Sequence, residues 1–163
     1  MPTLLSVWLL VTIMSTSVPR PAPTPEPLPS SLVAFFRYLR SVAPTGTGKA
    51  FVPQKPIDPE IVLQNVSSKG LFFSDVSPGA PGQVDVDRLR KEIRKARGDA
   101  FRYLVHLSYV VFNTERLGEA PEVVRMSETQ MRVDLGSEYQ LTFVNEGSDW
   151  RMTTVSVIDP YGD

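Results

Sequence analysis

Apolar residues recur at two different periods along the chain, and these periods predict helices first and strands later. After Ser30 they recur at three- and four-residue steps, which predicts a helix that Pro44 ends. Asp58 and Pro59 are a capping residue and a helix-starting proline, so we expect a second, shorter helix to about residue 66. Residues 86–98 predict a third helix, with apolar side chains on one side, basic side chains on the other and a glycine that stops it.

Beyond this third helix the period changes to two, which is typical of a strand. Residues 101–112 alternate over their full length and predict a long strand, although the pattern leaves a continuation of the preceding helix open. The run 145–149 is rich in turn-forming residues and predicts a hairpin between the last two strands. The other stretches that predict strands are 70–74, 123–135, 139–144 and 150–158.

The order of these elements predicts an α+β domain. Four amphipathic strands in succession are expected to form a curved antiparallel sheet, and the helices are the only long apolar elements left to cover its concave face. A cavity between the sheet and the helices is then the expected place for a ligand.

The element order and the closing residues 139–152 resemble the NTF2-like superfamily, which includes SnoaL-like proteins. In many members an alternating Y-x-L-x-F-V strand turns through a glycine-containing loop into a W-R/K-I/M strand, as YQLTFVNEGSDWRM does here. The resemblance implies a cone of four to five strands covered by about three helices, which often dimerises through its outer sheet face. The connection 44–56 is longer than a minimal member needs, and no Asp-His pair stands where enzymatic members usually place one.

The first thirty residues are not expected to belong to the fold. Residues 4–14 form an apolar run of eleven residues, shorter than the ~20 of a transmembrane helix and suited to a signal peptide. We therefore expect 1–17 to be a cleaved signal, with an uncleaved short anchor as the alternative, and the protein to be exported to the periplasm or outside the cell. Prolines at every second position of 18–29 predict an extended linker, which leaves one domain over 30–163.

Composition excludes several kinds of chemistry. The 163 residues contain no Cys and one His, so there is no thiol nucleophile and no Cys or His cluster for a metal, and we expect no metal and no cofactor. The formal charge is −1, and acidic residues partly neutralise the basic third helix, so nucleic acid is not an expected partner.

The candidate site residues are few. If 101–112 is a strand, His106 shares a face with Arg102, and the pair suits a general base beside an anion-stabilising cation. The candidate ligand-binding residues are Tyr109, Tyr139 and Trp150; the last two keep a polar tip that suits a cavity wall.

The small number of catalytic groups favours an exported, non-enzymatic binding or assembly module. Its expected partner is a protein or a small apolar ligand, and the module can form a homodimer. One alternative is a small SnoaL-like enzyme in which His106 is the base and Arg102 stabilises an enolate or carboxylate. The other is an anchored structural component of an envelope or secretion assembly. Contact with a membrane is expected only through the N-terminal segment, if it is not cleaved.

Overall fold

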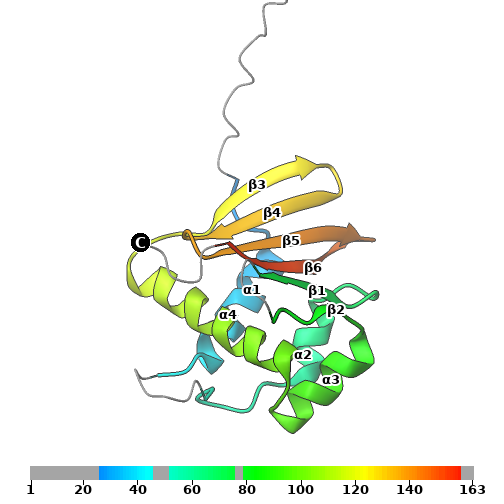
Figure 1. Cartoon of the computed structure of the whole chain (residues 1–163). Coiled ribbons are helices and arrows are strands. Elements are labelled where there is room, and N and C mark those ends of the chain that lie inside the picture. The colour runs from blue at the N-terminus through cyan, green and yellow to red at the C-terminus, as the bar shows by residue number, and fades with distance from the viewer. Residues whose placement is uncertain (1–25, 46–51, 76–78, 159–163) are drawn as a thin grey trace, which may run out of the picture.

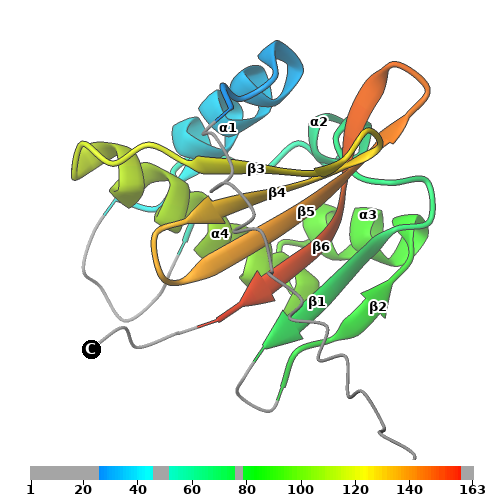
Figure 2. The ribbon, with the colours of Figure 1, turned by 90° about the horizontal axis from the view of Figure 1, so that it is seen from above.

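Six strands form a single sheet, and the helices lie against one of its two faces (Figures 1 and 2). The computed structural model describes residues 26–45, 52–75 and 79–158, so the predicted signal and most of the predicted linker lie outside it. The elements in chain order are α1 (Ser30–Val42), α2 (Pro59–Gln64), β1 (Leu71–Asp75), β2 (Gly82–Val84), α3 (Val86–Lys95), α4 (Asp99–Arg116), β3 (Glu122–Ser127), β4 (Gln130–Leu135), β5 (Tyr139–Glu146) and β6 (Asp149–Val157).

The sheet has the strand order β2-β1-β6-β5-β4-β3. Strands β3 to β6 are four consecutive antiparallel strands, of which β5 and β6 lie where the alternation predicts strands, whereas β1 pairs with β6 in parallel. The sheet is therefore mixed, and the fold is of the α+β class. The expected hairpin joins β5 to β6, and Gly147 lies in its turn with a φ of 79°.

The first three predicted helices are confirmed, each near its predicted start. The apolar stripe of α1 is buried, and its helix ends at Val42, just before Pro44. Asp58 caps α2 by accepting a hydrogen bond from the Glu60 amide at 2.9 Å, and Asp85 caps α3 in the same way at the Arg88 amide, at 2.8 Å. Side-chain capping thus places the starts of α2 and α3 where the sequence indicates, whereas α1 begins after Pro29 without a side-chain cap.

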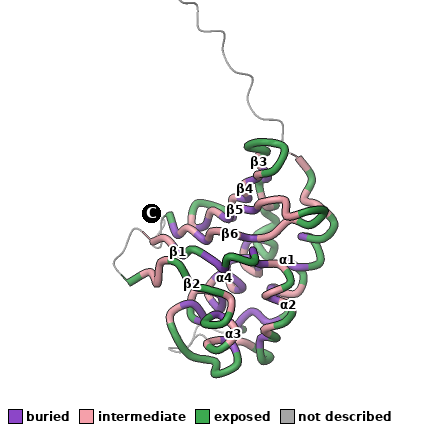
Figure 3. Tube along the Cα trace, turned by 90° about the vertical axis from the view of Figure 1, so that its right-hand side faces the viewer, coloured by how far each residue is buried: buried purple, intermediate pink, exposed green. Residues whose placement is uncertain are grey.

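The long strand predicted over 101–112 is wrong, because these residues form most of helix α4. Alternation misled here because apolar or aromatic residues occupy every second position of 101–112 and half of the positions between them. The same residues therefore satisfy a period of two and the helical period of 3.6 that the tertiary contacts use. Figure 3 shows α4 in the interior of the molecule, with much of its length buried. The buried side chains of α4 are Ala100, Phe101, Leu104, Val105, Leu107, Ser108, Val110, Val111 and Thr114.

The junction between α3 and α4 also differs from the prediction. Ala96, with a φ of 47°, ends α3, whereas Gly98 is the residue that precedes α4. The carboxylate of Glu92 accepts hydrogen bonds from the amides of Ala100 and Phe101, at 2.9 and 3.3 Å. An acidic side chain from α3 thus satisfies the first amides of α4, a contact that no local pattern around Gly98 indicates.

The single strand predicted over 123–135 is two strands, β3 and β4, and β2 was not predicted at all. In the β3–β4 hairpin Val123 pairs with Val133, so odd-numbered residues face the core in both strands. The alternation of core-facing and solvent-facing residues therefore continues through the turn without interruption, and the sequence pattern is that of one long strand. Within the described residues the sheet therefore has six strands instead of the predicted four to five, and the fold has four helices instead of about three.

Candidate functional site

One end of the sheet presents polar side chains to α4. Asp75 pairs with Val157 and Val157 with Tyr139, so the side chains of Asp75 and Tyr139 lie in one transverse row. Tyr139 and Val157 in this row are buried, which shows that the row faces the helices. The Tyr139 hydroxyl reaches α4, where its Oη lies 2.5 Å from Nδ1 of His106.

A second hydrogen bond lies one helical turn earlier on α4. The Tyr103 hydroxyl donates to Oδ2 of Asp75 at 2.5 Å, and the ring of Phe73 packs against the Tyr103 ring with centroids 5.6 Å apart. Because Tyr103 and His106 are three residues apart, they lie on the same side of the helix. We call Asp75, Tyr103, His106 and Tyr139 the α4 polar cluster.

Burial controls the protonation states in this cluster. Burial and the hydrogen bond to Asp75 raise the pKa of Tyr103 to about 12, and burial raises the pKa of Tyr139 further. Burial also lowers the pKa of His106, against the opposing attraction of the carboxylates of Glu138 and Asp75. At neutral pH the cluster therefore holds two protonated phenols and a neutral imidazole, which is a state in which His106 can accept a proton.

The structure brings together some of the predicted site residues and separates the others. His106 and Tyr139 are hydrogen-bonded, and the ring of Tyr109 stacks on His106 with centroids 6.3 Å apart. Arg102 is on the same helix but is exposed and forms an ion pair with Asp99. Trp150 lies in the β5–β6 hairpin, where the guanidinium of Arg125 is 5.0 Å from the centre of its ring. The predicted site residues therefore lie in different parts of the fold and do not line one common pocket.

Two members of the cluster, Asp75 and Tyr103, were not predicted. Asp75 is the last residue of a strand whose end is defined only by its parallel pairing with β6. Tyr103 joins His106 only when residues 101–112 are helical, because in a strand the two residues would lie on opposite faces. A helical interpretation of this segment would have found Tyr103, but no local signal indicates Asp75.

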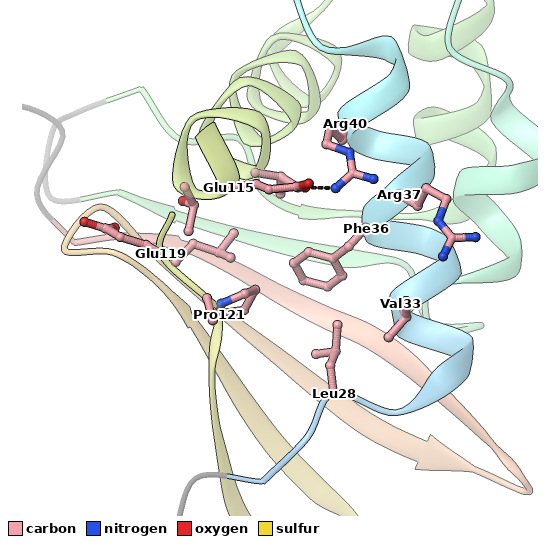
Figure 4. Close-up of a pocket in the computed structure, with 12 residues that line it drawn as sticks. Leu28, Val33, Phe36, Arg37, Arg40, Glu115, Glu119 and Pro121 are labelled. Atoms are coloured by element: carbon pink, nitrogen blue, oxygen red, sulfur yellow. Dashed lines mark ion pairs between the residues drawn. The ribbon is translucent and has the colours of Figure 1, made fainter. Parts of the chain in front are cut away.

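A separate pocket of about 320 Å³ lies between α1, α4 and the chain that leads into β3 (Figure 4). Its walls are mainly apolar, and Phe36 of α1 projects into it between Leu28 and Pro121. None of the four residues of the α4 polar cluster lines this pocket. The complete lining is Leu28, Val33, Phe36, Arg37, Arg40, Val111, Thr114, Glu115, Glu119, Ala120, Pro121 and Leu135.

The charged groups that line this pocket balance one another. Arg37 and Arg40 come from α1, while Glu115 and Glu119 come from the end of α4 and the segment after it. Arg40 and Glu115 form an ion pair that joins the two helices, as the dashed line in Figure 4 shows. Equal numbers of positive and negative side chains mean that the lining does not select a ligand by net charge.

The site and fold together define the chain as an α+β domain with a one-sided helical cover, a mainly apolar pocket and a half-buried polar cluster. Comparison with protein-family models, with curated proteins and with solved structures finds no match. Within the described ranges, no group of three or more His, Cys, Asp or Glu side chains is placed to hold a metal ion. No helix in those ranges has both the length and the apolar character needed to cross a membrane.

Proposed function

We propose that this protein is a non-enzymatic binding module for a small, mainly apolar molecule, and that the pocket between α1, α4 and β3 holds it. The observation that carries the proposal is the pocket itself, whose volume of about 320 Å³ is within the range of small-ligand sites. Its walls are largely apolar side chains, so transfer of an apolar ligand from water into the pocket is favourable.

The polar groups of the pocket restrict the ligand further. Because Arg40 and Glu115 neutralise each other, a ligand that meets them needs no net charge. A ligand with one ionised group would meet carboxylates as well as guanidinium groups in the lining. An uncharged molecule therefore fits best, with the guanidinium of Arg37 in the lining to orient it.

For the fold, we propose the NTF2-like cone, in agreement with the resemblance of residues 139–152. Its support is the order of elements: two helices, a short strand region, a further helical region and four consecutive antiparallel strands. The correction of 101–112 from strand to helix leaves this order intact, because the stretch 123–135 forms two strands, β3 and β4, and the number of consecutive strands stays at four. We further propose that the protein is exported, on the evidence of the apolar run 4–14.

Binding of a neutral fluorescent probe tests this function. N-phenyl-1-naphthylamine is uncharged and becomes fluorescent in apolar surroundings, so we expect it to bind the full chain and be displaced by unlabelled apolar molecules. Val33 lines the pocket and is 39% exposed, so Val33→Trp should block the pocket without removing core contacts. We expect about tenfold weaker binding, which corresponds to 1.4 kcal/mol.

Met126 provides the matched control because it is 55% exposed and does not line the pocket. Met126→Trp introduces the same indole and should leave the affinity for the probe unchanged. Saturable binding that both variants retain equally would place the probe outside this pocket. Absence of saturable binding to the unmodified chain would contradict the proposed function.

A second candidate function is a small SnoaL-like enzyme that uses His106 as general base. The observation that favours it is the hydrogen bond between His106 and Tyr139 in a cluster where burial lowers the pKa of the imidazole. In the tautomer in which Nδ1–H donates to Tyr139, Nε2 is the basic atom. His106→Ala would abolish turnover of a substrate in this case, whereas a binding module with this variant would keep its affinity for the neutral probe.

A further inference from the structure

The short segment 26–29 forms part of the pocket wall and also connects the domain to the chain that precedes it. We call this segment the N-terminal strap. Leu28 lines the pocket and packs against the hydrophobic core. The carbonyl of Pro29 accepts hydrogen bonds from the amides of Leu32 and Val33, at 2.9 and 3.0 Å, which fixes the end of the strap to α1.

The other end of the strap is held by a different element. A carboxylate oxygen of Glu26 lies 3.0 Å from a guanidinium nitrogen of Arg125 on β3. The same guanidinium lies over the ring of Trp150 on β6, 5.0 Å from its centre, so Arg125 is itself held in position. Glu26, Arg125 and Trp150 do not line the pocket.

We propose that the strap is a movable wall of the pocket, and that Glu26 and Arg125 are positioning residues that hold this wall in place. The inference rests on the proposed function, since it needs a ligand in the pocket. A ligand that contacts Leu28 binds more tightly when the strap is seated, so by linkage the bound ligand holds the strap against the domain. Occupancy of the pocket is thereby coupled to the position of the chain that enters at Glu26.

The structure predicts that displacement of the strap weakens the binding of a ligand. Leu28 supplies apolar surface to a ligand, so displacement of the strap removes one wall and weakens binding. Arg125 cannot touch a ligand in this pocket, yet its loss should weaken binding through Glu26 and Leu28. Because exposed ion pairs contribute little energy, the expected effect of Arg125→Gln is about two- to fivefold in affinity.

The test measures binding of N-phenyl-1-naphthylamine to the full chain and to four variants. Glu26→Gln and Arg125→Gln should each weaken binding by about the same factor. The double variant should bind no more weakly than either single variant, because both substitutions remove the same ion pair. Asp149→Asn is the matched control: it removes the exposed pair that Asp149 forms with Arg151, neither of which lines this pocket. This control should bind as the unmodified chain does.

A second readout follows the strap directly. The chain contains no cysteine, so Pro27→Cys creates a single position for a nitroxide label within the strap. Addition of the probe should slow the motion of this label in the electron paramagnetic resonance spectrum, and Arg125→Gln should reduce that response. A variant that only destabilises the domain would not change label motion in this ligand-dependent way.

The outcomes separate the two proposals. If the probe does not bind the unmodified chain, the proposed function fails and the coupling fails with it. If the probe binds and Val33→Trp blocks it, but Arg125→Gln binds equally well and the label does not respond, the strap inference alone is overturned. Tighter binding in Arg125→Gln would also overturn it, because the strap would then obstruct the pocket.

Discussion

His106 on α4 and Tyr139 on β5 are joined by a hydrogen bond of 2.5 Å between Nδ1 and Oη. The two residues are thirty-three positions apart in sequence, and this contact holds the middle of the long helix against the sheet. Tyr139 is almost completely buried, and a buried hydroxyl needs such a partner because its desolvation is costly otherwise. Protonation of the His106 imidazole is therefore expected to affect the packing of Tyr139 in the core.

We expect the stability of the protein to depend on the protonation of His106 as the pH falls below 6.5. Burial lowers the pKa of His106 from its ordinary value of 6.5. The unfolded chain then binds a proton more readily than the folded chain, so the free energy of unfolding falls as the pH is lowered through 6.5 toward the folded-state pKa. Denaturant titrations at several pH values should show this fall, and His106→Gln should reduce its slope in the same window.

The single histidine makes the underlying pKa directly measurable. His106 is the only source of imidazole resonances, so a proton NMR titration reports one midpoint without assignment. We expect this midpoint below 6.5 in the folded protein. A midpoint at or above 6.5 would contradict the assignment of a half-buried imidazole that is neutral at pH 7. It would show that the attraction of the carboxylates of Glu138 and Asp75 outweighs the effect of burial on the pKa.

At alkaline pH the phenols of the cluster should ionise late. The pKa of Tyr103 is raised to about 12, and that of Tyr139 is also raised, mainly by burial in both cases. Because these folded-state values exceed the unfolded value of 10, the stabilising effect is complete below pH 10 and is lost as the pH rises through about 12. Ultraviolet titration of the folded protein should show tyrosinate forming in more than one stage.

Substitution of Tyr103 by Phe provides the check on this titration. The variant should lose the absorbance change near pH 12 that the Tyr103 phenol gives in the unmodified protein. If all tyrosines of the unmodified protein ionise together near pH 10, the burial of Tyr103 and Tyr139 in the cluster would be wrong.

The helical structure of residues 99–116 can be tested by a matched pair of leucine substitutions. Leu104 is fully buried in α4, whereas Leu117, directly after the helix, is 66% exposed. Leu104→Ala should lower the free energy of unfolding by about 2–5 kcal/mol because it leaves a cavity in the core, and Leu117→Ala should change it by about 0.5 kcal/mol or less. Equal effects of the two substitutions in denaturant titrations would be inconsistent with this packing.

The sequence was sufficient to predict the elements that local chemistry defines. Capping by Asp58 and Asp85 and the turn at Gly147 were readable because each feature depends on residues a few positions apart. Helix α4 could not be predicted in this way, because which of its residues are buried depends on the helices and the sheet that pack against it. The two-residue turn between β3 and β4 was hidden for a related reason, since cross-strand pairing keeps the same residue parity on both sides.

The candidate site was predictable only in part for the same physical reason. His106 was singled out as the only histidine, and Tyr139 as an aromatic residue with a polar tip. Their partners Tyr103 and Asp75 depend on the phase of α4 and on the parallel pairing of β1 with β6, both of which are long-range features. The pocket between α1, α4 and β3 also depends on how separate elements pack, so no motif in the sequence indicates it.

Two glycines with similar backbone conformations should respond very differently to substitution by alanine. Gly70 and Gly147 both have positive φ, at 91° and 79°, so alanine is strained at either position. A Cβ at Gly70 would lie 2.2 Å from the carbonyl oxygen of Val84, in the backbone that leads into α3, whereas a Cβ at Gly147 meets nothing within 4 Å. Gly147→Ala should therefore lower the free energy of unfolding only by the conformational strain, about 1–2 kcal/mol.

Gly70→Ala adds a backbone collision to that strain, which a side-chain rotation cannot relieve because the obstructing atoms are main-chain atoms of Val84 and Asp85. Relief requires β1 to move away from the start of α3, and this disrupts the pairing of Leu71 with Val84. We expect a total loss of about 2–5 kcal/mol from strain and overpacking together. Denaturant titration of both variants at neutral pH measures the difference. A loss at Gly70 no larger than that at Gly147 would show that Gly70 does not approach the main chain of Val84 and Asp85 as closely as described.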